Sequence, residues 1–112
     1  RMGINIWEVI DAASTKPFGF TPFYPGPGIG GECIPVDPLY FSWKAKQYDA
    51  PTAMIDVASH VNIKTSNYVV HRIQLLLNKE NRPLKNAKIL IVGVAFKKNV
   101  SDIRESPALK II

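Results

Sequence analysis

The sequence predicts a mainly α fold with one long helix, followed by the first β-strand of an α/β unit. Apolar residues recur every three or four positions between residues 52 and 82, with no glycine or proline among them. An apolar run interrupted by one glycine occupies residues 89–96, as in buried parallel strands. Ser106-Pro107 then forms a typical helix start. The chain ends inside this last helix, which suggests a piece of a longer polypeptide.

A short helix is expected near the beginning of the chain. Asn5 can cap a helix that begins at Ile6, and Glu8 stands three residues after Asn5 as in a capping box. The proline at position 17 ends this helix.

Residues 16–38 are rich in proline and glycine and are expected to form a shaped loop. A second short helix should then open at Asp37-Pro38 and run to Lys46.

The long helix should contain roughly 25–28 residues and extend about 40 Å. A helix of that length in a small chain cannot cover its own apolar stripe, so a partner chain is expected to cover it, as in a homodimer. A polar connector ending at residue 86 separates the two predicted domains, residues 1–86 and residues 87–112.

The composition narrows the class of protein. The 112 residues are 46% hydrophobic, which allows one modest core. A single cysteine excludes an internal disulfide, and no secretory leader is visible, so a cytoplasmic location is expected. The net charge of +5 suits an anionic partner such as a nucleotide sugar or a dinucleotide. Basic residues are scattered and the apolar runs are short, so neither a nucleic acid nor a membrane is predicted as a partner.

The most informative segment is YPGPGIGGECIPVDP at residues 24–38. Gly26, Gly28 and Gly31 satisfy the spacing G-x-G-x-x-G. No strand is predicted before them, and prolines follow where a helix should run, so we reject a dinucleotide fingerprint. The glycines instead predict a backbone that can adopt positive φ and approach a ligand closely.

Cys33 lies inside this segment. A lone cysteine is often an apolar filler, but this one lies between glycines and prolines rather than on a periodic element, which favours a nucleophile. Asp37, four residues later, could accept a proton or could cap the following helix, and the spacing leaves both roles open. His60 and His71 lie on the long helix without a ligand partner at useful spacing, so no metal site is predicted.

Two long motifs resemble those of the UDP-glucose/GDP-mannose dehydrogenase family. The sequence FGFTPFYPGPGIGG from residue 18, with IPVDP from residue 34 and WKA from residue 43, most resembles the UDP-N-acetylglucosamine 6-dehydrogenase branch. The sequence GVAFKKNVSDIRESP at residues 93–107 resembles a second family motif at the usual distance downstream. One departure is Glu32, where that branch commonly has histidine.

This resemblance implies a fold and a reaction. Residues 1–86 would hold the catalytic cysteine loop and a central helical dimerisation domain, and residues 87–112 would begin a truncated, Rossmann-like UDP-binding domain. The reaction would oxidise C6 of UDP-N-acetylglucosamine, or of a related UDP-N-acetylhexosamine, with two NAD through a cysteine thiohemiacetal and thioester. The uronic acid would serve surface polysaccharide synthesis. Cys33 would be the nucleophile, and Asp37 the carboxylate that assists the water or the proton transfers.

The resemblance also implies binding residues. The expected substrate contacts are Tyr24, Pro25, Gly26, Pro27, Gly28, Ile29, Gly30, Phe96 and Lys97. The expected NAD contacts are Cys33, Ile34, Pro35, Val36 and Arg104. The piece alone should be inactive, because the NAD-binding segment and an upstream lysine and asparagine of the family fall outside it. The alternatives are UDP-glucose or UDP-N-acetylmannosamine as the substrate, or an isolated helical dimerisation module without activity of its own.

Overall fold

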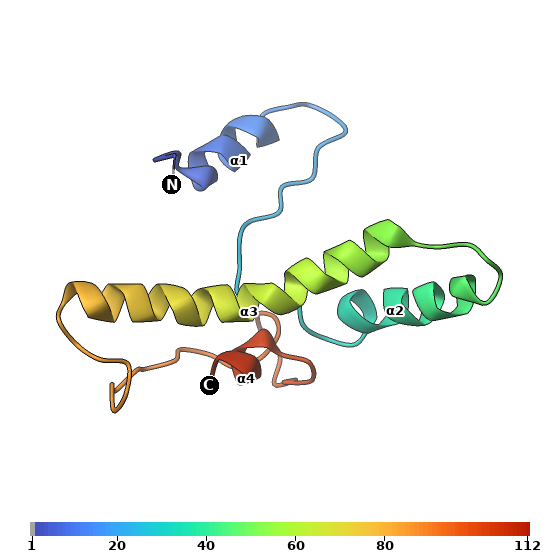
Figure 1. The fold of residues 1–112 in the computed structure, drawn as a ribbon. Coiled ribbons are helices and arrows are strands. Elements are labelled where there is room, and N and C mark those ends of the chain that lie inside the picture. The colour runs from blue at the N-terminus through green and yellow to red at the C-terminus, as the bar shows by residue number, and fades with distance from the viewer. Residues whose placement is uncertain (1) are drawn as a thin grey trace.

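The computed structural model describes residues 2–112, and this range contains four helices (Figure 1). Helix α1 spans Ile6–Ser14, α2 spans Cys33–Lys46, α3 spans Ala53–Lys79 and α4 spans Pro107–Ile111. Helices α2 and α4 both pack against α3, whereas α1 lies apart from them beyond a long loop (Figure 1). The prediction of a mainly α fold is confirmed.

Helix α1 begins where its capping residues predict. The Asn5 side-chain oxygen accepts a hydrogen bond of 3.1 Å from the backbone N–H of Trp7. The Asn5 side-chain amide donates to Glu8 Oε1 at 2.9 Å, so Glu8 reaches the side chain of the cap rather than its backbone. These contacts satisfy groups that the first turn leaves without helical partners.

The predicted start of helix α2 is wrong, because the helix begins at Cys33 and not at Asp37-Pro38. Pro35 lies in the first turn, where a missing backbone N–H costs nothing, and Pro38 lies further inside the helix. The prolines therefore do not prevent a helix, which removes one of the reasons for rejecting a dinucleotide fingerprint. Asp37 lies inside the helix, and the N-cap position belongs to Glu32.

Helix α3 contains 27 residues, as its periodicity predicts. Its large apolar side chains remain open to solvent, including Met54, Val57 and Val61. Among residues 2–112 the buried polar side chains are Ser42, Ser66 and Ser106, and the one buried apolar side chain is that of Pro107. The described part of the chain thus supplies no apolar core of its own. None of its helices combines the length and the apolar character needed to cross a membrane.

The β-strand expected at residues 88–96 is not confirmed, because residues 2–112 contain no strand. Side-chain exposure still alternates there, at 87% and 89% for Leu90 and Val92 against 46% and 37% for Ile89 and Ile91. A strand needs hydrogen bonds from a neighbouring strand, and the described residues offer no second run of this kind. The predicted start of α4 is confirmed, since the Ser106 hydroxyl accepts from the Ala108 N–H at 3.3 Å. The domain boundary after residue 86 stays a prediction.

Candidate active site

Two segments that are far apart in sequence meet at one place in the structure. We call residues 24–33 the cysteine loop and residues 93–107 the downstream motif. The Gly31 N–H donates a hydrogen bond of 3.1 Å to the Arg104 carbonyl oxygen. A Cβ on Gly30 would lie 2.6 Å from the Glu105 carbonyl oxygen and 2.8 Å from the Phe96 Cβ. The lack of a side chain at Gly30 therefore lets the two segments touch.

Gly31 serves the same contact in a second way. Its φ of +90° is unfavourable for residues with a side chain, and a Cβ there would lie 2.9 Å from the Phe96 ring. We expected the glycines to let the backbone approach a ligand. At Gly30 and Gly31 the close approach is instead to another part of the protein.

Helix α3 holds the cysteine loop through Asn62. The Ile29 N–H donates to Asn62 Oδ1 at 2.7 Å, and Asn62 Nδ2 donates to the Ile29 carbonyl oxygen at 3.0 Å. Sequence reasoning did not single out Asn62 and missed this role. The available signal was a polar residue among apolar neighbours at helical spacing.

The downstream motif is a closed turn that leads into α4. The Phe96 N–H donates to the Asp102 carbonyl oxygen at 3.2 Å, and the Ser106 hydroxyl donates to the Val94 carbonyl oxygen at 2.6 Å. Ser106 is buried. These bonds fix the shape of the turn that carries Lys97, whose Nζ lies 5.4 Å from the centroid of the Phe96 ring.

A hollow of about 680 Å³ opens between the cysteine loop and the downstream motif. It brings together four of the predicted substrate residues, Pro27, Gly28, Phe96 and Lys97. Its volume lies in the range of small-molecule sites, about 300–1,000 Å³. The Lys97 ammonium adds a positive charge suited to a phosphate group. The remaining predicted substrate residues do not line this hollow; they are Tyr24, Pro25, Gly26, Ile29 and Gly30.

Tyr24 is occupied by contacts with α1. Its hydroxyl donates a hydrogen bond of 2.7 Å to Asp11 Oδ1, and its ring stacks on Trp7 with the centroids 5.5 Å apart. The hydrogen bond to Asp11 is the main cause that raises the pKa of Tyr24 above its ordinary value. Tyr24 thus joins α1 to the cysteine loop.

Cys33 is exposed and is the first residue of α2. The first turn of a helix leaves backbone N–H groups without partners and carries a partial positive charge, which favours an anion such as a thiolate. Asp37 follows four residues later on the same helix, and this spacing places the two side chains on one helix face.

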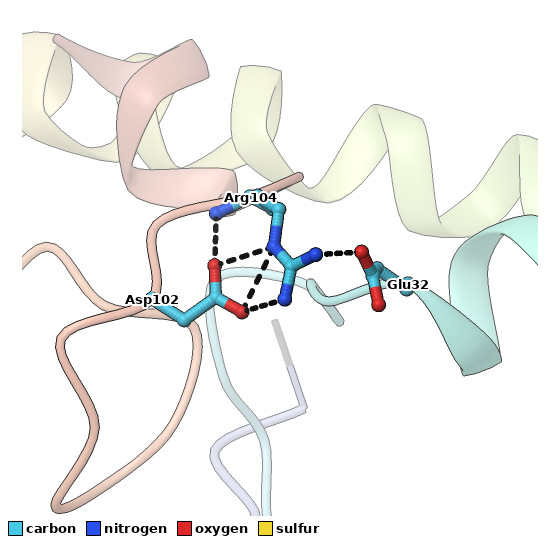
Figure 2. A network of polar contacts seen from close by, with 3 residues as sticks. All are labelled: Glu32, Asp102 and Arg104. Carbon is cyan, nitrogen blue, oxygen red and sulfur yellow. Dashed lines mark hydrogen bonds and ion pairs between the residues drawn. The ribbon is translucent and has the colours of Figure 1, made fainter.

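Arg104 connects the downstream motif with the residue that precedes Cys33. Its Nε lies 3.0 Å from both carboxylate oxygens of Asp102, and its Nη2 lies 2.6 Å from Asp102 Oδ2. Its Nη1 forms an ion pair with Glu32, on the opposite side of the guanidinium (Figure 2). Sequence reasoning predicted Arg104 as a cofactor contact and missed both carboxylate partners.

The other predicted cofactor residues are divided between two apolar hollows. Ile34 and Pro35 line one of about 400 Å³ between α2 and α3, and Val36 lines another beside Tyr40 and Trp43. Ile34 and Pro35 could form one apolar wall against a nicotinamide ring. Residues 2–112 contain no phosphate-binding turn between a strand and a helix, so they fit only one end of a dinucleotide.

The chain is similar to several dehydrogenases. It is 37% identical over 112 residues to the UDP-N-acetyl-D-mannosamine dehydrogenase of Methanocaldococcus jannaschii, and covers 24% of that protein. It is 35% identical to the NDP-N-acetyl-D-galactosaminuronic acid dehydrogenase of Ralstonia solanacearum, of which it covers 25%.

The solved structure of a UDP-D-ManNAc dehydrogenase from Pyrococcus horikoshii is also similar. It matches 97% of this chain, and 25% of its own, with a TM-score of 0.87 and 33% identity. The chain therefore spans about a quarter of the length of these relatives. Residues 1–64 match the family described as UDP-glucose/GDP-mannose dehydrogenase, central domain. Together these similarities show that the chain belongs to the UDP-glucose/GDP-mannose dehydrogenase family.

Proposed function

We propose that this chain is the cysteine-bearing part of an NAD-dependent dehydrogenase that oxidises C6 of a UDP-N-acetylhexosamine to the uronic acid. One observation carries the proposal: the cysteine loop, which ends at Cys33 in the first turn of α2, meets the downstream motif around a hollow lined by Phe96 and Lys97. Membership of the family supports it.

Cys33 would act as the nucleophile. Its thiolate adds to the C6 aldehyde left by the first oxidation, which gives a thiohemiacetal bound to the protein. Loss of a hydride from this carbon then gives a thioester, and water hydrolyses it to release the acid and restore the thiol. NAD, held by residues 33–36 and Arg104, would supply the hydride acceptor for both oxidations. Asp37 would accept the proton of the attacking water, because it lies one turn further along the same helix.

The substrate would lie in the hollow between the cysteine loop and the downstream motif. Lys97 would attract the diphosphate, while Pro27 and Gly28, the residues of the cysteine loop that line the hollow, would contact the sugar. Residues 33–36 and Arg104 would face the nicotinamide cofactor. The exposed position of Cys33 supports this arrangement, since both sugar and cofactor must reach the thiol.

The proposal also concerns which UDP-N-acetylhexosamine is the substrate. The sequence motifs favour UDP-N-acetylglucosamine, whereas relatives from Methanocaldococcus jannaschii and Pyrococcus horikoshii carry the name of UDP-N-acetylmannosamine. We therefore propose the UDP-N-acetylhexosamine class, with UDP-N-acetylmannosamine as the first candidate. The acid would enter surface polysaccharide, and the enzyme would act in the cytoplasm.

A homodimer formed through α3 is part of the same proposal. The apolar side chains that α3 leaves open to solvent support it, because residues 2–112 contain nothing else to cover them. A helical dimerisation module without activity is the competing reading of this helix.

The decisive experiment follows NADH formation by the full-length protein with a panel of UDP-sugars. We expect two NADH per sugar for one UDP-N-acetylhexosamine. Cys33→Ser should abolish the second oxidation, because the hydroxyl is a far weaker nucleophile than a thiolate. Asp37→Asn should slow release of the acid, and the control Asp49→Asn, in the turn after α2, should not. If no NADH forms with any of the sugars, the proposed activity is wrong and the competing reading, a helical dimerisation module without activity, is favoured.

A further inference from the structure

The half-buried Asn62 makes an unusual contact from the middle of α3. Its planar amide accepts from the Ile29 N–H and donates to the Ile29 carbonyl oxygen, so one side chain satisfies both backbone groups of one residue. Neighbouring strands pair residues in the same way in a β-sheet. A side chain of α3 therefore satisfies the backbone N–H and C=O of Ile29, as a neighbouring strand would in a sheet.

The cysteine loop has few other attachments. The Tyr24 hydroxyl ties its beginning to Asp11 in α1, and the Gly31 N–H ties its end to the downstream motif. Between these two points the hydrogen bonds among residues 2–112 connect the loop to α3 through Asn62 alone. The intervening residues include Gly26 and Gly28, and glycines lose much conformational freedom when a loop is ordered.

Gly28 also depends on this contact. Its φ is +132°, and a Cβ there would lie 3.3 Å from Asn62 Oδ1 and 3.2 Å from the Pro107 Cβ. The loop thus passes between α3 and α4 with little room for a side chain at residue 28. Asn62 is the polar group at this crossing that fixes the position of the backbone.

We propose that Asn62 is a positioning residue, which holds residues 26–30 in the conformation that receives the ligand. It acts through Ile29 and does not itself touch the ligand. The identity of that ligand, a UDP-sugar, rests on the proposed function. A loop ordered before binding raises the fraction of binding-competent protein, and apparent affinity rises in proportion to this fraction.

The first test needs no catalysis and uses amide hydrogen exchange in the full-length protein. In Asn62→Ala the Ile29 N–H loses its acceptor, and its exchange should become about tenfold faster, the loss expected for one hydrogen bond. Asn67→Ala is the matched control, because Asn67 is exposed on the same helix. Unchanged exchange at Ile29 in Asn62→Ala would overturn the assignment.

Asn62→Asp separates pairing from packing, because it keeps the volume of the side chain. The carboxylate can still accept from the Ile29 N–H, but it places a second oxygen against the Ile29 carbonyl oxygen instead of a donor. Exchange at Ile29 should therefore also become faster than in the wild type. If exchange in Asn62→Asp equals that of the wild type, the bond from Asn62 to the Ile29 carbonyl oxygen does not hold the loop, and the paired contact that the proposal requires is wrong.

The second test measures steady-state kinetics with the UDP-sugar that the wild type oxidises. Asn62→Asp should raise KM for the sugar nucleotide about tenfold and lower kcat much less. The disordered loop must become ordered when the ligand binds, and this lowers the apparent affinity rather than the rate of the bound complex. Asn67→Asp controls for the added negative charge. A fall in kcat with an unchanged KM would overturn the positioning role. Wild-type protein that oxidises no UDP-sugar would contradict the proposed function, while the exchange measurements would still decide the role of Asn62.

Discussion

The cysteine loop and the segment at residues 88–92 differ in where their partners lie. Residues 28–31 are held by two hydrogen bonds to Asn62, by one to Arg104 and by close packing against Phe96. Residues 89–92 precede that packing by only a few positions, yet Leu90 and Val92 are almost fully exposed. The first segment finds its partners within the described residues, and the second does not.

The chain therefore contains one segment whose contacts lie within residues 2–112 and one segment whose pairing partner is not among them. The contacts between the cysteine loop and the downstream motif described above lie within residues 2–112. The apolar segment keeps the alternation of a strand but has nothing to pair with among residues 2–112. We expect each region to respond to substitution according to where its partner lies.

The largest effect is expected at Leu90. If residues 88–96 pair with strands elsewhere in the full-length protein and become buried, Leu90→Lys would place a charge without a partner inside that domain. The unfolding free energy should then fall by about 3–5 kcal/mol. Leu90→Val is the control, because it stays apolar and favours strands. Chemical denaturation of the full-length protein measures the unfolding free energy of both variants. A negligible effect of Leu90→Lys would contradict the prediction of a buried strand at residues 88–96.

The elements that were predicted correctly have local signals. The cap at Asn5, the Ser106-Pro107 start and the uninterrupted periodicity of α3 each lie within the element that they define. The start of α2 was missed because Asp37-Pro38 was taken as the helix start and Pro35 was counted against an earlier one, although the first turn of a helix tolerates proline.

The contacts that build the candidate site were less visible in the sequence. Ile29 and Asn62 are 33 residues apart, and Glu32 and Arg104 are 72 residues apart. No local pattern specifies such pairs, since they depend on how the helices pack. The cysteine loop and the downstream motif were recognised separately by resemblance, but their packing against each other was not predicted.

The second largest effect is expected at Gly30, inside the junction. Its φ is not positive, so Gly30→Ala tests space alone, and the new Cβ would collide with the Glu105 carbonyl oxygen. Overpacking of this kind costs about 1–3 kcal/mol. Gly26→Ala is a matched control in the same loop, because a Cβ there meets nothing within 4 Å. Equal denaturation midpoints for the two variants would show that the junction is loose.

A smaller effect is expected where Arg104 neutralises Glu32. Removing the cation with Arg104→Gln leaves the negative charge of Glu32 unpaired next to Cys33, and this charge repels an anionic alkylating reagent such as iodoacetate. Both side chains are about 60% exposed, at 61% and 60%, so alkylation of Cys33 at neutral pH should slow by only about two- to fivefold. The double variant Arg104→Gln with Glu32→Gln should recover the wild-type rate. Failure of that recovery would show that Arg104 acts on Cys33 by another route.

The smallest effect is expected at the contact between α2 and α3, where Asp56 accepts hydrogen bonds from Lys46 and Ser42 at 2.8 Å each. The Lys46 ammonium, followed by the Ser42 hydroxyl, lowers the pKa of Asp56 below its ordinary value.

A lowered folded-state pKa means that this contact stabilises the protein above the unfolded-state pKa, which is about 3.9. The stabilisation disappears as pH falls through the lower folded-state value. Asp56→Asn should therefore lower the unfolding free energy near neutral pH, and its deficit relative to the wild type should shrink in acid. Asp49→Asn, outside this contact, should show no such convergence when both are measured by denaturation across the acid range. A deficit for Asp56→Asn that stayed constant with pH would mean that packing, and not the carboxylate charge, joins the two helices.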